Sequence, residues 1–250
     1  MDHPYRILFE PVPIGPVTAP NRFYQVPHCN GMGHRMPRAL AAMRGMKAEG
    51  GWAVVSTEEV EIHPSSETTP YVEGRLWDDA DIPAHALNVE RIHAHGALAA
   101  IELVHSGMAA NNLYTRIPPM GPSHRPTSGD LYPIQARRMD KQDISNLRRW
   151  HREATVRAVQ AGYDIVYVYA GHNLSTLQHF LSPRYNSRTD EYGGSLENRS
   201  RLLREVLEEA LEAVDGCEVQ VTVAGGHDDG LGQRMLGGGL EARRQAQQLV

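Results

Sequence analysis

The chain has 250 residues, of which 41% are hydrophobic, so it can bury one large core, and its length suits a single α/β barrel or two smaller domains. A formal net charge of −5 and 13 scattered histidines give no basic footprint, so we expect no nucleic-acid partner. No apolar run approaches the roughly 18 to 20 residues that span a bilayer, the amino terminus lacks a signal peptide's pattern, and cysteines are few, so we expect a cytoplasmic protein without a membrane span.

The elements predicted in chain order alternate between strands and helices. Segment 9–21 is rich in proline, and we expect it to form a short hairpin across one mouth of a barrel. Short β-branched and aromatic runs predict strands at 23–27, 52–57, 97–104, from 163 onward and at 217–223. Apolar residues at helical spacing predict helices at 37–49, 83–95, 141–161 and from Ser195 onward. The proline-containing segment 106–140 is predicted to be an excursion that covers the carboxyl ends of the strands.

Four strand-helix units and a fifth strand predict an α/β fold with a parallel sheet, because parallel neighbours need a crossover helix. We expect a (β/α)8 barrel that is incomplete, with about five strands and four helices. Such barrels assemble their sites from the loops at the carboxyl ends of the strands. The residues that fall at those ends include Cys29, Glu59, Glu102, His105, Tyr169 and His172.

The sequence changes character near its end, and we divide it into an amino-terminal barrel portion, 1–223, and an atypical Gly/Gln-rich tail, 224–250. A barrel needs eight strands so that no edge stays unpaired, and the chain supplies five at most. The missing strands have three possible explanations: a fragment, a reading-frame slip, or completion by a partner chain. We favour the first two. An ordinary mobile tail explains the composition but leaves the missing strands unexplained.

Four segments together resemble the old yellow enzyme superfamily of flavin-dependent (β/α)8 barrels. They are Pro27-His-Cys-Asn-Gly-Met-Gly33, Glu102-Leu-Val-His-Ser-Gly107, the strand and loop that end at His172, and the long, specific stretch from Phe180 to Arg199. The resemblance extends over about residues 7–221. Within the superfamily the chain looks most like the branch of trimethylamine and dimethylamine dehydrogenases, histamine dehydrogenase and N-methyl amino acid demethylases.

Three departures from the ene-reductase branch indicate this assignment. Ene reductases usually have a His and an Asn or His to grip a carbonyl oxygen after the fourth strand, where this chain has Tyr169 and His172, as the amine dehydrogenases do. The familiar His-Ala-Gly-Arg after the third strand is replaced by His105-Ser-Gly-Met108. Cys29 stands where trimethylamine dehydrogenase attaches its FMN covalently. A lone cysteine is otherwise most often a small buried hydrophobe.

The resemblance also implies roles for the site residues. Tyr169 and His172 would be catalytic, and a Tyr–His pair can manage a proton near neutral pH while an amine nitrogen presents its lone pair. The cofactor-binding residues would be Pro27, His28, Cys29 and Glu102, with Glu102 on the flavin pyrimidine edge. Structural roles remain alternatives for His28 and Glu102, and packing is expected for His105.

Glu59 is the candidate substrate-binding residue. Trimethylamine dehydrogenase has an aromatic residue at this place, one wall of a cage for a methylated ammonium. A carboxylate there favours an amine that keeps an N–H, such as a secondary amine or an N-methyl amino acid. A solvated loop acid is the alternative interpretation.

The function that follows is FMN-dependent oxidation of a methylated amine by hydride transfer to flavin, with N-demethylation. The alternatives are an NAD(P)H-dependent ene reductase of the old yellow enzyme type and a non-catalytic truncated remnant. A full-length relative would add a 4Fe-4S centre and pass electrons to an electron-transferring flavoprotein, and a homodimer is the expected assembly. No HExxH or paired CxxC occurs, so we expect no catalytic metal site.

Overall fold

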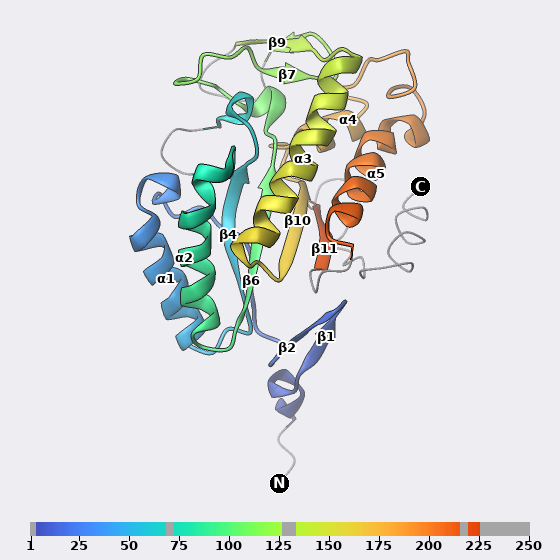
Figure 1. Ribbon diagram of the computed structural model, residues 1–250. Coiled ribbons are helices and arrows are strands. Elements are labelled where there is room, and N and C mark those ends of the chain that lie inside the picture. Colours follow the sequence, from blue (N-terminus) through green and yellow to red (C-terminus); the bar gives the residue numbers. More distant parts are fainter. Residues whose placement is uncertain (1–3, 69–72, 127–133, 216–219, 226–250) are drawn as a thin grey trace.

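A parallel β-sheet forms the centre of the molecule. The computed structural model describes residues 4–68, 73–126, 134–215 and 220–225. Five strands follow one another in the order β11-β10-β6-β4-β3, and β5 pairs with the end of β4. All pairings in this sheet are parallel, so the carboxyl ends of its strands meet at one edge, at the top of Figure 1.

The strands of this sheet lie close to their predicted positions, except β5, which falls in a segment without a predicted strand. They are β3 (Tyr24–Gln25), β4 (Val54–Glu61), β5 (Gly74–Arg75), β6 (Leu98–Val104), β10 (Ile165–Ala170) and β11 (Gln220–Gly225). The main difference is β4, which continues for four residues beyond the predicted end at residue 57. Glu58, Glu59 and Glu61 therefore belong to the strand. The predicted end at residue 57 would have placed them after it.

The helices that cover one face of the sheet begin and end where local signals place them (Figure 1). They are α1 (Pro37–Glu49), α2 (Ile82–His93), α3 (Lys141–Ala161) and α5 (Leu196–Ala213), with a short α4 (Thr176–Leu181) that follows β10. In α3 the Asp140 and Asp143 side chains form a capping box, and Gly162, at φ 94°, ends the helix. The Ser195 side chain caps α5, as predicted.

Two apolar clusters hold the layers together. The larger lies between the sheet and the helices and includes Val55, Val60, Ile101, Leu147 and Leu207. The smaller lies on the opposite, inner face, where the predicted hairpin, β1 (Val12–Ile14) and β2 (Val17–Ala19), packs against the strands. Figure 1 shows this hairpin at the amino-terminal ends of the strands.

The excursion after β6 lies at the other end of the sheet, as predicted (Figure 1). It contains a small sheet of β7 (Met120–Gly121), β8 (Arg125–Pro126) and β9 (Gln135–Arg138). Single turns of 3-10 helix occur along the chain: η1 (Arg6–Phe9), η2 (Gly33–Arg35), η3 (Pro64–Ser66), η4 (Asp79–Asp81) and η5 (Gly107–Ala109).

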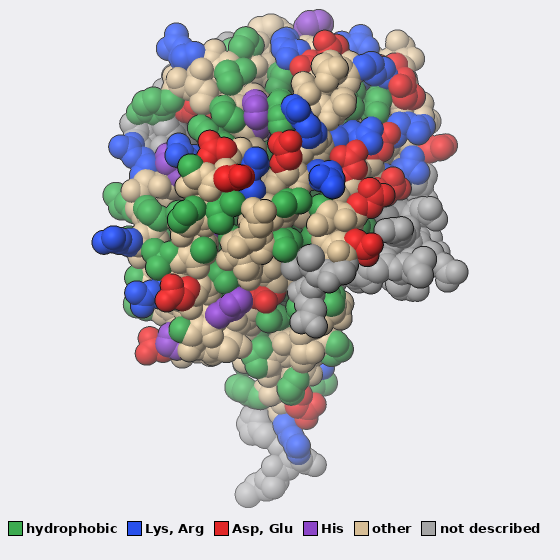
Figure 2. Space-filling model, in the orientation of Figure 1, with side chains coloured by type: hydrophobic (Ala, Val, Ile, Leu, Met, Phe, Trp, Pro, Cys, Tyr) green, Lys and Arg blue, Asp and Glu red, His purple; other side chains and the backbone are tan. Residues whose placement is uncertain are grey.

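The surface over α3 and α5 mixes acidic and basic side chains (Figure 2). Ion pairs such as Arg148–Glu209, at 2.5 Å, link the two helices. Among the described residues, no helix has the length and apolar content to cross a membrane. Of the proposed tail, residues 226–250 lie outside the described part of the chain, and residues 224 and 225 form the end of β11.

Candidate active site

The predicted site residues come from the carboxyl ends of four neighbouring strands. Cys29 follows β3, Glu59 lies near the end of β4, Glu102 near the end of β6, and Tyr169 near the end of β10, with His172 two residues beyond that strand. In the sheet register Glu59 pairs with Glu102, and Glu102 pairs with Tyr167. The structure therefore brings Cys29 near Tyr169, which lies 140 residues further along the chain.

A β-bulge determines which acidic side chain of β4 faces the inner side of the sheet. The register against β6 is Ser56↔Ala100 and then Glu59↔Glu102, so β4 has one residue too many between these pairs. The Thr57 hydroxyl fills the irregularity: it accepts a hydrogen bond from the Glu102 N–H at 3.0 Å and donates to the Glu58 carbonyl at 2.7 Å.

The extra residue shifts the alternation of the strand by one position. Glu59 then shares the inner face with Glu102, whereas Glu58 turns toward the helices and meets Arg44 at 2.9 Å. Glu59 is 7% exposed, so the interpretation of Glu59 as a solvated loop acid is wrong.

Tyr169 and His172 contact each other at the end of β10. The Tyr169 hydroxyl is hydrogen-bonded to His172 Nδ1, and the two rings lie 5.8 Å apart. Both His172 and Asn173 adopt left-handed backbone angles, with φ of 53° and 59°. Such angles are costly for residues other than glycine and persist where the surroundings impose them, often at functional sites.

Side chains of α4 impose this backbone. The Gln178 amide oxygen accepts a hydrogen bond from the Asn173 N–H at 2.5 Å, and His179 Nε2 binds the Asn173 carbonyl at 3.0 Å. The Ser175 hydroxyl donates to the Tyr169 carbonyl at 2.6 Å. The side chains of α4 therefore bind both the N–H and the carbonyl group of Asn173, the residue after His172.

Burial changes the protonation of the acidic side chains. Burial and then the nearby charge of Glu73 raise the pKa of Glu59 to about 7, and a hydrogen bond from Tyr169 opposes that rise. Burial and then the charge of Glu59 raise the pKa of Glu102 well above its usual value. Glu102 therefore keeps its proton to a higher pH than an ordinary glutamic acid does, whereas Glu59 exchanges its proton near pH 7.

The phenol is held in its neutral form. Burial, then the charges of Glu59 and Glu102, raise the pKa of Tyr169 far above its usual value. The sequence had suggested a phenol whose proton is managed near neutral pH through His172. In the structure the neighbouring Glu59 carboxyl group titrates near neutrality.

Cys29 differs from the buried hydrophobe that a lone cysteine usually is, because the residue is exposed. Partial enclosure by protein atoms and then the charges of Glu59 and Glu73 raise the pKa of the thiol to about 12. The thiol is therefore protonated at neutral pH and lies near Glu59, the carboxyl group that also acts on Tyr169.

A buried arginine holds the loop of Pro27, His28 and Cys29. Arg44 on α1 is 0% exposed and donates to the His28 carbonyl at 3.0 Å and to the Gln25 amide oxygen at 2.9 Å. The His28 ring lies within 3.2 Å of the Gln25 amide and 3.3 Å of Lys47 Nζ. Burial and the nearby Arg44 charge lower the pKa of His28.

His105 belongs to a group of imidazoles behind the sheet, which we call the histidine cluster: His63, His105, His151 and His179. His105 bonds Ser65 Oγ at 3.0 Å and Thr176 Oγ1 at 2.8 Å and stacks on Trp150, so the expected packing role is confirmed. A Cβ on Gly107 would collide with the Thr176 hydroxyl, so only glycine fits beside α4.

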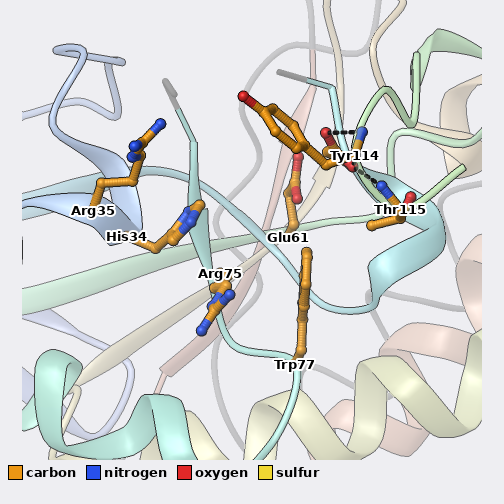
Figure 3. A pocket seen from close by; sticks show the side chains of 8 residues that line it. His34, Arg35, Glu61, Arg75, Trp77, Tyr114 and Thr115 are labelled. Carbon is orange, nitrogen blue, oxygen red and sulfur yellow. Dashed lines mark hydrogen bonds between the residues drawn. The ribbon is translucent and has the colours of Figure 1, made fainter. Parts of the chain in front are cut away.

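A pocket of about 390 Å³ adjoins the site. Figure 3 shows Glu61 pointing into it, with Trp77, Tyr114 and Thr115 around it. Backbone N–H groups of Tyr114 and Thr115 bind the Glu67 carboxylate at 2.8 to 3.2 Å. None of the site residues predicted from the sequence lines this pocket, but Glu61 lies two residues after Glu59 on β4.

The residues present suit the flavin that the resemblance implies. A flavin pyrimidine edge alternates carbonyl acceptors with an N–H donor, and the buried carboxyl group of Glu102, whose pKa is raised, can both donate and accept when it is protonated. The thiol of Cys29 and the phenol of Tyr169 border the same region. Among the residues that the structure describes, no three His, Cys, Asp or Glu side chains are grouped so as to hold a metal ion.

Three features of the site were not predicted from the sequence. They are the β-bulge at Thr57, the hydrogen bonds from side chains of α4 to the Asn173 backbone, and the hydrogen bond from Arg44 to the His28 carbonyl. A bulge leaves no pattern in a single strand, because it is defined by the partner's register. The six residues of α4 are too few for helical periodicity.

Comparisons with known proteins agree with this geometry. The model of the NADH:flavin oxidoreductase / NADH oxidase family matches residues 7–233. Dimethylamine dehydrogenase from Hyphomicrobium sp. (strain x) is 39% identical over 229 residues, which are 88% of this chain and 31% of that protein.

Two solved structures have similar folds. Histamine dehydrogenase from Rhizobium sp. 4-9 has 53% identity and a TM-score of 0.86, over 90% of this chain and 34% of that one. The 6-hydroxypseudooxynicotine amine oxidase from Pseudomonas geniculata N1 has 49% identity and a TM-score of 0.86, over 89% and 33%. The expected partial α/β barrel is confirmed, and the chain spans about a third of the length of these relatives.

Proposed function

Because the chain belongs to the NADH:flavin oxidoreductase / NADH oxidase family, we propose that it is the amino-terminal barrel portion of an FMN-dependent enzyme that oxidises a methylated amine. The observation that supports this most is the Tyr169–His172 pair at the end of β10, with Glu59 and Cys29 beside it. Three of the similar proteins are named for the oxidation of amines.

The chemistry of the pair suits an amine. Removing a hydride from the carbon next to nitrogen requires a nitrogen lone pair, which a protonated ammonium lacks. Tyr169 and His172 offer an oxygen and a ring nitrogen that can accept and pass on the ammonium proton. Bound FMN supplies the hydride acceptor, and the resulting iminium hydrolyses to formaldehyde and the demethylated amine.

The remaining site residues would hold the cofactor. We assign Glu102 to the pyrimidine edge and the loop of Pro27, His28 and Cys29 to the ring, with a covalent bond between Cys29 and FMN. The exposure of the Cys29 residue supports this assignment.

Glu59 would bind the substrate. It is a buried carboxyl that exchanges its proton near pH 7, so it can pair with a cationic amine or accept a hydrogen bond from an N–H. A secondary amine or an N-methyl amino acid offers both. A protonated tertiary amine has a single N–H, which it must lose before oxidation. We therefore rank tertiary amines lower as substrates.

Further parts of the activity belong to a longer protein. We propose that a full-length form, with the roughly threefold length of the relatives, adds a 4Fe-4S centre, transfers electrons to an electron-transferring flavoprotein and forms a homodimer. We retain the division into a barrel portion, 1–223, and a distinct tail, 224–250, and a cytoplasmic location as predictions.

One similarity favours a second candidate function. NADPH dehydrogenase from Halalkalibacterium halodurans is 37% identical over 171 residues, 68% of this chain and 48% of that protein. An NAD(P)H-dependent reduction of activated alkenes is therefore the alternative.

A substrate screen separates the two candidates. Flavin-loaded protein is incubated with dimethylamine and sarcosine plus an artificial electron acceptor, and in parallel with NADPH and cyclohexenone. Amine oxidation predicts formaldehyde from the first mixture and no alkene reduction in the second. Reduction of the enone without formaldehyde would reverse the assignment. The absence of both products would support the non-catalytic alternative.

A further inference from the structure

The bulge in β4 places the Glu59 carboxyl group on the inner face of the sheet. A regular strand would place Glu58 there. Counting by twos from Ser56 places Glu58 on the inner face, but the register against β6 places Glu59 there. The bulge interrupts the backbone hydrogen bonds between β4 and β6. The Thr57 hydroxyl compensates by accepting a hydrogen bond from the Glu102 N–H. Bulges of this kind re-aim side chains next to active sites.

The re-aimed carboxyl group contacts the phenol at the end of β10. The Glu59 carboxyl and the Tyr169 hydroxyl lie within reach of an interaction that lowers the pKa of Glu59 and raises that of Tyr169, although β6 lies between their strands in the sheet. Tyr169 also bonds His172 Nδ1. A phenol has one proton to donate, so when Tyr169 donates to the Glu59 carboxylate, His172 Nδ1 is the donor to the phenol oxygen.

We propose that Glu59 is the proton acceptor behind Tyr169: the phenol receives the ammonium proton of the substrate and passes its own proton to the Glu59 carboxylate. This inference deepens the proposed amine oxidation and rests on it. It adds to the Tyr–His pair a third group, which the bulge in β4 places in contact.

The protons and electrons balance without a further reactant. The N–H bond of the ammonium breaks, and its electron pair stays on nitrogen as the lone pair that hydride removal requires. The proton joins the Tyr169 oxygen while the original phenol proton joins a Glu59 oxygen. The substrate loses one positive charge and the carboxylate loses one negative charge, so the pair of charges disappears inside a buried site.

The phenol cannot perform this step alone. Its pKa lies far above the usual value, so a phenolate left behind in this site is unfavourable. The groups that face Glu59 are acidic: Glu73 before β5, Glu102 on β6, Glu61 on β4 and the Cys29 thiol after β3. Burial and then the charge of Glu73 raise the pKa of Glu59 to about 7, where a carboxylate is available and still a useful base.

The first test needs neither flavin nor substrate. Tyrosines labelled with ¹³C at Cζ are followed by NMR in the 250-residue chain, and Tyr169→Phe identifies the Tyr169 signal. We expect that signal to shift with an inflection near the pKa of about 7 of Glu59. The inflection should vanish in Glu59→Gln and remain in Glu61→Gln, the matched control from the same strand face.

A Tyr169 signal that keeps the same inflection in Glu59→Gln, or that shows none in the parent chain, would overturn the proposal. Because this titration is independent of turnover, it can fail while amines are still oxidised, and it can succeed if they are not. Circular dichroism of each variant checks that the chain folds.

Kinetics of the flavin-loaded full-length form provide a second test. A proton acceptor contributes roughly 10²-fold or more to rate, so Glu59→Gln should lower kcat by about that factor and flatten its dependence on pH around neutrality. A higher KM with unchanged kcat would show that Glu59 only attracts the cationic substrate, and would contradict the proposal.

Discussion

Replacing Arg44 with methionine tests whether the buried ion pair behind the site supports both the fold and the Cys29 loop. Arg44 and Glu58 are 0% exposed and their charged atoms lie 2.9 Å apart. Methionine fills similar volume but leaves the Glu58 carboxylate buried without its cation. It also removes the donors to the Gln25 side chain and the His28 carbonyl.

The magnitude follows from the burial of the pair. Breaking a fully buried ion pair by removing one partner costs about 3 to 5 kcal/mol, a large share of the roughly 5 to 15 kcal/mol that stabilises a domain. Urea unfolding followed by circular dichroism measures the loss. Arg44→Met should therefore move the midpoint to markedly lower urea.

The control is the double variant Arg44→Met/Glu58→Leu. An apolar pair often replaces a buried ion pair without loss, so most of the stability should return, although the His28 loop stays without its donor. A single variant that loses less than about 1 kcal/mol, or a double variant as unstable as the single one, would refute the reasoning.

Three other predictions concern pH, the flavin and the bulge. Burial lowers the pKa values of the imidazoles in the histidine cluster from the usual value of about 6.5, to about 4 for His63 and His179 and to about 3 for His151. Below pH 6.5 the unfolded chain therefore binds more protons than the folded chain does. Stability should therefore fall as pH drops from about 6.5 toward 4, by up to about 1.4 kcal/mol per pH unit for each imidazole that stays neutral, and a flat profile in urea titrations would contradict this. In a flavin-loaded full-length form, acid precipitation should leave yellow flavin on the parent protein and release it from Cys29→Ala, whereas free flavin in the parent's supernatant would exclude the covalent bond. Thr57→Val should cost about 1 to 3 kcal/mol, because the Glu102 N–H loses its acceptor, and should weaken the Tyr169–Glu59 coupling in the NMR titration; unchanged coupling would show that the bulge does not depend on this hydroxyl.

The predicted helices were accurate where local chemistry determines their ends. In α1, Pro37 stands at the first turn and Gly50 directly follows the last residue. In α3, the capping box marks the start and Gly162 the end of the helix. These signals act within a few residues, so a single sequence contains them. The strand ends that supply Cys29, Glu102 and Tyr169 followed from the same local patterns.

The missing details depend on contacts between distant segments. The true length of β4 and its bulge follow from pairing with β6, more than 40 residues away, and the left-handed backbone of His172 depends on side chains of α4. The pKa of Glu59 reflects burial and Glu73, neither of which is visible before the chain folds. Residue types could be predicted, but their protonation could not.

A single-turnover absorbance measurement tests the central claim most directly. Flavin-loaded full-length protein is mixed anaerobically with dimethylamine, in the parent form and in Tyr169→Phe, and the absorbance of oxidised flavin is followed. We predict that the amine bleaches the parent's flavin without NADPH, and that Tyr169→Phe bleaches at least about 10²-fold more slowly with unchanged flavin content. Bleaching by NADPH but by no methylated amine, or an unaltered rate in Tyr169→Phe, would contradict the account.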